Sequence, residues 1–124
     1  MGKLWLKVRR DNWVMGLDAI VYHLDSDETA AVHKRLGNVG TISALAAEVL
    51  PVVGTDSVLI KRVFYSGSHS GDRVPLEELN RLEAEINVLR KNLPERSVFL
   101  ERFLNDVSHL INKAREEGMP IEFV

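Results

Sequence analysis

Hydrophobic and charged residues alternate at the beginning of the chain, and this alternation predicts a β-strand over residues 3–9. Leu4, Leu6 and Val8 fall on one side of that strand, and mostly basic residues fall on the other. A period of two indicates a strand with one buried and one solvent-facing side. Because charged side chains protect a sheet edge from aggregation, we expect this strand to be an edge strand.

The next hydrophobic segments carry the spacing of two short helices. Four apolar residues repeat at intervals of three and four, and they are Leu17, Ile20, Val21 and Leu24. This is the helical template, although the Ile-Val-Tyr sequence at 20–22 also suits a strand. We expect a helix over residues 17–24 and a second short helix over residues 29–36, which ends at Gly37.

A clearer apolar stripe runs from Ile42 to Leu50 and predicts a third helix. Thr41 is its expected N-cap, and Pro51 is its expected end. After a polar loop, residues 58–65 are rich in β-branched and aromatic side chains. Because their apolar side chains would occupy both faces, we expect this segment to be a central strand.

Two long amphipathic helices are predicted in the second half of the chain. The first begins at Pro75, which suits a first helical turn. Its apolar stripe comprises Leu76, Leu79, Leu82, Ile86 and Leu89. The second helix follows a break where Asn92 and Glu95 resemble a capping box, and Gly118 is its expected end. The apolar-rich residues 121–124 are then expected to form a strand that is tied into the sheet.

These elements predict a single domain over residues 1–124, of the α/β class with an α+β two-layer arrangement. We expect a small mixed sheet of about three to four strands packed against amphipathic helices, with a C-terminal strand following two long helices. The two helices form a crossover long enough for strands 58–65 and 121–124 to pair in parallel.

Composition and charge exclude several classes of function. The chain has no cysteine, which rules out disulfides, thiolate metal sites and cysteine nucleophiles. Its formal net charge of −2 argues against bulk binding of nucleic acid, which requires a clustered positive surface. No apolar segment has the length of a signal-peptide core or of a bilayer span, so we expect a cytoplasmic protein that does not contact a membrane.

Small, hydroxyl-bearing and titratable residues are densest in segment 65–72, just before a predicted helix. Ser68, His69 and Asp72 supply the residue types of a nucleophile, a base and an orienting group. The nucleophile-elbow pattern Gly-x-Ser-x-Gly nevertheless fails, because histidine occupies its central position. The alternative is a turn whose serines and aspartate cap the following helix, with Arg73 beside it as a weak candidate for holding an anion.

Metal and cofactor sites are not predicted. The four histidines lie far apart and form no ligand pattern on a predicted helix. Neither a phosphate loop nor a dinucleotide fingerprint is present. Asp25, Asp27 and Glu28 form an acidic group, which is either a solvated loop or a docking patch that attracts a basic partner.

Four landmarks give the chain a resemblance to a known group of proteins. They are Arg35-Leu36-Gly37-Asn38, the segment Tyr65-Ser66-Gly67-Ser68-His69-Ser70-Gly71-Asp72, Glu85-Ile86, and the closing Pro120-Ile121-Glu122-Phe123. In these landmarks the protein resembles small bacterial immunity proteins of polymorphic or contact-dependent toxin systems, and related uncharacterised families. The resemblance implies a cytoplasmic inhibitor without catalytic residues, which occludes a cognate toxin domain by surface complementarity.

We therefore predict a non-catalytic immunity protein that blocks its toxin sterically, as a monomer or a homodimer. The residues expected to contact the partner are Ser68, His69, Ser70, Asp72, Arg73, Asp25, Asp27 and Glu28. The alternative is a small hydrolase-like enzyme that uses Ser68, His69 and Asp72, which would require His69 to line a concave pocket. A purely structural subunit is a third hypothesis, for which Trp5 and Trp13 would form an exposed apolar patch.

Overall fold

The computed structural model describes residues 16–64 and 73–123, apart from the side chains of residues 26–28. Its elements in chain order are the strands β1 (Gly16–His23) and β2 (Ser26–Asn38), the helix α2 (Val39–Val53), the π-helix η1 (Leu59–Phe64), the strand β3 (Arg73–Val74), the 3₁₀-helix η3 (Leu76–Glu78), the helices α3 (Leu79–Asn92) and α4 (Val98–Glu117), and the strand β4 (Ile121–Phe123). The strand predicted over residues 3–9, both tryptophans and the predicted contact residues Ser68, His69, Ser70 and Asp72 lie outside the described residues.

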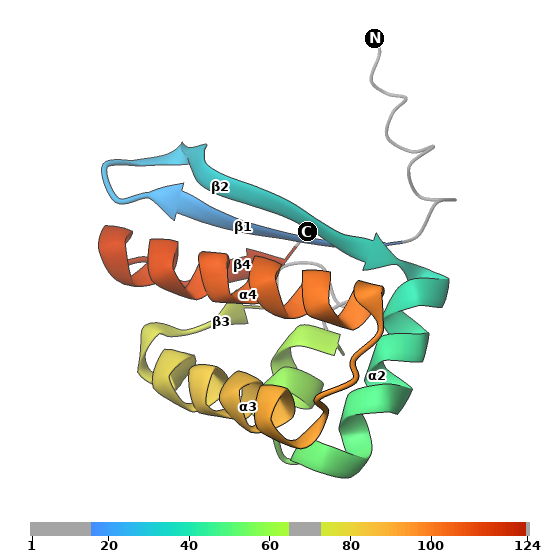
Figure 1. Ribbon diagram of the computed structural model, residues 1–124. Coiled ribbons are helices and arrows are strands. Elements are labelled where there is room, and N and C mark those ends of the chain that lie inside the picture. The colour runs from blue at the N-terminus through green and yellow to red at the C-terminus, as the bar shows by residue number, and fades with distance from the viewer. Residues whose placement is uncertain (1–15, 65–72, 124) are drawn as a thin grey trace, which may run out of the picture.

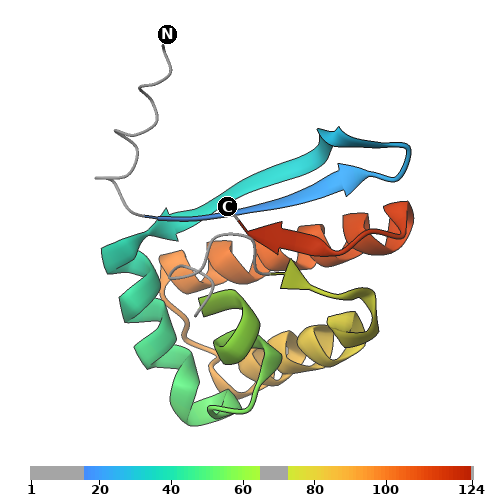
Figure 2. The same ribbon diagram turned by 180° about the vertical axis from the view of Figure 1, so that it is seen from behind.

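The four strands form one sheet in the order β2-β1-β4-β3, and each neighbouring pair is antiparallel. The described helices all lie on one side of the sheet, with α4 next to β1 and β2 and α3 farther away (Figure 1). The opposite view shows η1 between α2 and α3 (Figure 2). The predicted α/β class is confirmed, including the C-terminal strand after two long helices, although the described sheet is antiparallel rather than mixed.

The helix predicted over residues 17–24 is wrong, because these residues form β1 and the start of the following turn. Leu17, Ala19 and Val21 are buried, and the residues between them are only half-buried. This period of two is the side-chain alternation of a strand with one covered face. Leu24, which completes the helical spacing in the sequence, is 68% exposed and contributes nothing to the core.

The short helix predicted over residues 29–36 is also wrong, because this segment belongs to the edge strand β2. Its register with β1 places His33 opposite Ile20 and Arg35 opposite Asp18. The Arg35 guanidinium donates a hydrogen bond to the Asp18 carboxylate at 3.3 Å. Pairing as a hairpin satisfies backbone groups that the two strands turn toward each other, and this tertiary gain outweighs a weak local helical pattern.

Residues 59–64 are helical, which corrects the predicted central strand over residues 58–65. The buried residues of η1 are Leu59, Ile60, Val63 and Phe64. Lys61 and Arg62, which lie between them, are both exposed. Two adjacent exposed charges are incompatible with a strand buried on both faces, since neighbouring side chains of a strand point to opposite sides. The expected parallel pairing is therefore wrong, and β4 instead pairs antiparallel with β1 and β3.

The helices α2 and α3 occupy predicted segments, but their ends differ from the prediction. Asn38 rather than Thr41 caps α2, because the Asn38 side chain accepts the Thr41 N–H at 2.8 Å. The helix also continues past Pro51, which lies inside its last turn. Leu76 is exposed in η3 rather than part of the buried stripe, which begins at Leu79.

The predicted second long helix is confirmed as α4, and its predicted C-terminal end at Gly118 is confirmed as well. Ser97 caps it by accepting the Leu100 N–H at 3.0 Å, so the capping box predicted at Asn92 and Glu95 is wrong. Gly118 has a φ of 68°, a left-handed backbone that glycine adopts without steric cost.

The end of the described chain is anchored in the core, as predicted. Ile121 and Phe123 of β4 are buried, and β4 lies between β1 and β3 in the sheet. Within the ranges that the structure describes, no helix is long and apolar enough to cross a membrane.

An ion pair between Glu83 and Arg115 connects α3 to α4 on their outer side. The Arg115 guanidinium donates to both carboxylate oxygens of Glu83, at 3.0 and 3.1 Å, and this hydrogen bonding lowers the pKa of Glu83 below its usual value of 4.5. A carboxyl group whose pKa is lowered by folding stabilises the fold above its unfolded-state pKa. That stabilisation is lost as the pH falls through the folded-state pKa. Both side chains are largely exposed, so the contribution is small.

We expect Glu83→Gln to lower the melting temperature slightly at neutral pH and to lose this effect as the pH falls through the lowered folded-state pKa of Glu83, below which the carboxyl group is protonated in both states. Circular dichroism melts at neutral pH and at a pH below the folded-state pKa measure this difference. Glu77→Gln is the matched control, because Glu77 is exposed and forms no ion pair with any described residue. An equal deficit of Glu83→Gln at both pH values would contradict a role of the carboxylate charge.

Candidate functional site

The described residues among those predicted to contact a partner lie in separate parts of the sheet. Arg73 is exposed at the beginning of β3, opposite Glu122 of β4. Asp25 is exposed in the turn between β1 and β2, and Asp27 and Glu28 belong to β2. Because β4 and β1 lie between β3 and β2, the structure does not bring Arg73 and the acidic group together. Their roles in binding stay predictions.

The turn that carries Asp25 is held against the C-terminal end of α4. The Leu24 N–H donates to the Glu117 carboxylate at 3.1 Å, and His23 Nδ1 lies 3.5 Å from the same oxygen. This end of the molecule therefore presents the exposed side chains of Leu24 and Asp25 next to each other. An exposed carboxylate beside an apolar side chain suits contact with a basic surface.

A second surface, which the sequence analysis did not find, lies at the beginning of α4. Val98 and Phe99 are the first two residues of this helix, and they are 81% and 63% exposed. Arg102 lies three to four residues further along and is therefore their neighbour on the helix surface. We call Val98, Phe99 and Arg102 the α4 face. Its signal in the sequence is a pair of apolar residues just before the buried stripe, which begins at Leu100.

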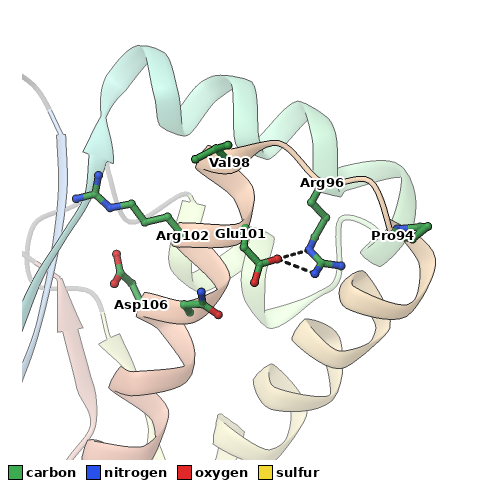
Figure 3. Close-up of a pocket in the computed structure, with 7 residues that line it drawn as sticks. Pro94, Arg96, Val98, Glu101, Arg102 and Asp106 are labelled. Atoms are coloured by element: carbon green, nitrogen blue, oxygen red, sulfur yellow. Dashed lines mark hydrogen bonds and ion pairs between the residues drawn. The ribbon is translucent and has the colours of Figure 1, made fainter.

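An open hollow of about 580 Å³ adjoins the α4 face (Figure 3). It is lined by Pro94, Arg96, Val98, Glu101, Arg102, Asn105 and Asp106. Arg96 is engaged in holding the loop between α3 and α4, because it donates to the carbonyls of Arg90 and Leu93 and to the Glu101 carboxylate. Arg96 thus shapes the hollow, whereas Arg102 is directed away from that ion pair (Figure 3).

A smaller hollow of about 220 Å³ lies between the end of β2 and the beginning of α4. It is lined by Arg35, Leu36, Gly37, Asn38, Thr41, Phe99 and Arg102. Arg102 therefore lines both hollows. The smaller hollow contains two guanidinium groups and no carboxylate, and the first turn of α2 beside it has no acidic residue.

Arg102 is the cation of this surface that is free to bind a partner. Arg35 is paired with Asp18 at 3.3 Å, and Lys34 lies 3.8 Å from Asp106. Arg102 is exposed, and its side chain has no hydrogen bond or ion pair within the part of the chain that the structure describes. An unpaired guanidinium next to an exposed aromatic ring can recognise a carboxylate and an apolar side chain at the same time.

In residues 16–64 and 73–123 there is no group of three or more histidine, aspartate or glutamate side chains that could hold a metal ion. Comparison with known proteins adds no family, since no family model, curated protein or solved structure matches the chain. The α4 face and the sequence are therefore the grounds for assigning a function.

Proposed function

We propose that this protein is a non-catalytic binding protein, and that the α4 face is its main contact surface. The observation that supports this most is the exposure of Val98 and Phe99 beside Arg102. Exposing two large apolar side chains next to each other forgoes the free energy of burying them. Aromatic and arginine side chains are also the types that dominate the binding energy of protein interfaces.

The charge of the surface specifies the chemistry of the partner. Arg102 and Arg35 flank the smaller hollow, and the positive end of the α2 helix dipole lies beside it. An acidic side chain of the partner would fit between them, with an apolar side chain packed against Phe99. The expected partner is therefore a protein surface on which a carboxylate and an apolar residue are adjacent.

The more specific proposal is that the partner is the toxin domain of a bacterial toxin system and that this chain is its cytoplasmic immunity protein. The resemblance in the landmark segments supports this assignment. Blocking would be steric, because a bound immunity protein needs only to cover the substrate path of the toxin. The acidic group and the loop residues predicted from the sequence would then be a second contact region. The alternative of a small hydrolase depends on Ser68, His69 and Asp72, which lie outside the described residues.

The reading frames that flank the gene provide the test of the immunity function. Each is expressed inducibly in a laboratory strain, with and without this chain, and growth is followed. We expect one product to arrest growth and this chain to relieve the arrest by forming a complex with it. If no flanking product is both toxic and bound by this chain, the immunity assignment is wrong.

Variants of the α4 face test the proposed surface. We expect Phe99→Ala and Arg102→Ala each to weaken toxin binding by about thirtyfold, the size of an interface hot spot, as measured by titration calorimetry. The matched controls are Val88→Ala and Lys91→Ala, which change an exposed apolar and an exposed basic residue of α3. Full binding by the first two variants and loss of binding in Asp25→Asn would instead assign the contact to the acidic end.

A further inference from the structure

Two exposed surfaces of this chain are complementary in chemistry. The α4 face offers two exposed apolar side chains beside the unpaired guanidinium of Arg102, which suits a carboxylate next to an apolar residue. The turn between β1 and β2 presents such a pair, because Leu24 and the adjacent Asp25 are both exposed. The Asp25 carboxylate has no hydrogen bond or ion pair with any other described residue. Each copy of the chain therefore carries both halves of one contact.

The two surfaces lie at opposite ends of α4 (Figure 1). The α4 face is at the beginning of this helix, whereas the turn is anchored at its end, where the Leu24 N–H donates to the carboxylate of Glu117. A helix of 20 residues is about 30 Å long. The turn therefore cannot reach the α4 face of its own copy, and its complement must come from another molecule.

We propose that two copies of this chain associate through these surfaces, with the turn of each docked on the α4 face of the other. The Asp25 carboxylate of one copy pairs with the Arg102 guanidinium of the second copy, and Leu24 packs against Phe99. Two copies that lie antiparallel along α4 form both contacts at once, because the two surfaces are at opposite ends of the helix. The second contact is then intramolecular, so a closed dimer is favoured over an open chain of molecules.

Apolar burial supplies most of the stabilisation in this arrangement. Leu24, Val98 and Phe99 are all largely exposed in a single copy, and docking removes their apolar area from water. An exposed ion pair contributes little by itself. Its role is to select the partner surface, because like charges brought together at the same place oppose association.

The dimer would cover the α4 face, so self-association and binding of the toxin domain would exclude each other. This consequence rests on the proposed function, whereas the contact between the two copies does not. The tests below use the chain alone, so a failure of the dimer leaves the immunity function standing.

The first test is the oligomeric state of the unmodified chain by sedimentation equilibrium. We expect monomer and dimer in an equilibrium that shifts toward the dimer as the concentration rises. A chain that stays monomeric up to its solubility limit, or that assembles into species larger than a dimer, would overturn the proposal.

Exchange of charges tests the pairing of Asp25 with Arg102. We expect Asp25→Arg and Arg102→Asp each to raise the dissociation constant of the dimer by about tenfold or more, because each substitution places like charges together in both contacts. An equimolar mixture of the two variants should associate as tightly as the unmodified chain, since every contact in the mixed dimer again joins opposite charges. A chain that carries both substitutions should do so for the same reason.

Glu77→Arg and Lys61→Asp are the matched controls. They change the net charge by the same amounts at exposed positions of η3 and η1, and they should dimerise as the unmodified chain does. If the two folded charge variants of the contact did not associate when mixed, Asp25 and Arg102 would not be partners.

Cross-linking provides a test that leaves the charges in place. The chain has no cysteine, so Leu24→Cys and Val98→Cys each introduce a single thiol. We expect a short bismaleimide to join the two variants when they are mixed and to leave each variant by itself largely uncross-linked, because its two thiols lie at opposite ends of the dimer. Equal cross-linking of the mixture and of the separate variants would exclude docking of the turn on the α4 face.

Discussion

Replacing Phe103 by alanine is expected to lower the free energy of unfolding by about 4 kcal/mol, as measured by denaturant unfolding. Phe103 is 1% exposed in the middle of the core. Its ring stacks on that of Phe64, with centroids 5.1 Å apart, and so connects α4 to η1. Truncation would remove this contact and leave a cavity that the surrounding helices can fill only in part.

Phe99 provides the matched control, because it is the same residue type one turn earlier on the same helix. It is 63% exposed, so Phe99→Ala should change the free energy of unfolding by no more than about 0.5 kcal/mol. A stable Phe99→Ala variant that no longer binds the partner would separate the binding role of this side chain from any structural role. Equal destabilisation by the two substitutions would contradict the exposure of Phe99.

The second large effect is expected at Glu85, whose replacement by alanine should cost about 3 kcal/mol. The carboxylate of Glu85 on α3 accepts the N–H groups of Val58 and Leu59, both at 2.9 Å. These two residues begin the helical segment, and their side chains are buried. Without Glu85, their N–H groups would have no partner at this end of the helix, and an unsatisfied buried donor is costly.

Two control variants isolate this contribution. Glu85→Gln keeps an amide oxygen that can accept one of the two N–H groups, so an intermediate loss is expected. Glu95→Ala changes an exposed glutamate in the loop before α4 and should leave stability unchanged. If Glu85→Ala were as stable as Glu95→Ala in urea, η1 would not depend on this cap, and the reason given below for its helical form would be wrong.

The elements predicted correctly are those whose local pattern and tertiary environment agree. The stripe from Leu100 to Ala114 has one apolar side and lies against the sheet, and Gly118 ends it because only glycine takes that backbone at no cost. The closing residues Ile121 and Phe123 are apolar at the end of the chain, and the structure buries both in the core.

The elements predicted incorrectly are those in which a contact from a distant part of the chain decides the conformation. Residues 58–64 have the composition of a strand, but Ser57 and Glu85 cap them as a helix, and Glu85 comes from α3. The apolar residues of segment 17–24 also have helical spacing. The segment forms a strand because its backbone pairs with β2 on one side and with β4 on the other.

The candidate surface also combines features that are local in the sequence with features that depend on contacts between distant segments. Charged groups that are close together along the chain, such as the acidic residues around Asp25, were predicted as contact residues. The α4 face was not predicted, because Arg35 and Arg102 line one hollow only after β2 and α4 have packed together. Val98 and Phe99 alone gave a local signal, since both are apolar at positions outside the buried stripe.

The sequence by itself determined the fold class, the long helices and the final strand, because helical periodicity and glycine or proline stops act over a few neighbouring residues. Only the tertiary structure decided which apolar segments became β1, β2 and η1, since strand pairing and the Glu85 cap join residues far apart along the chain. It also decided which hydrophobic side chains stay exposed, because burial depends on what packs against a helix and not on the helix alone.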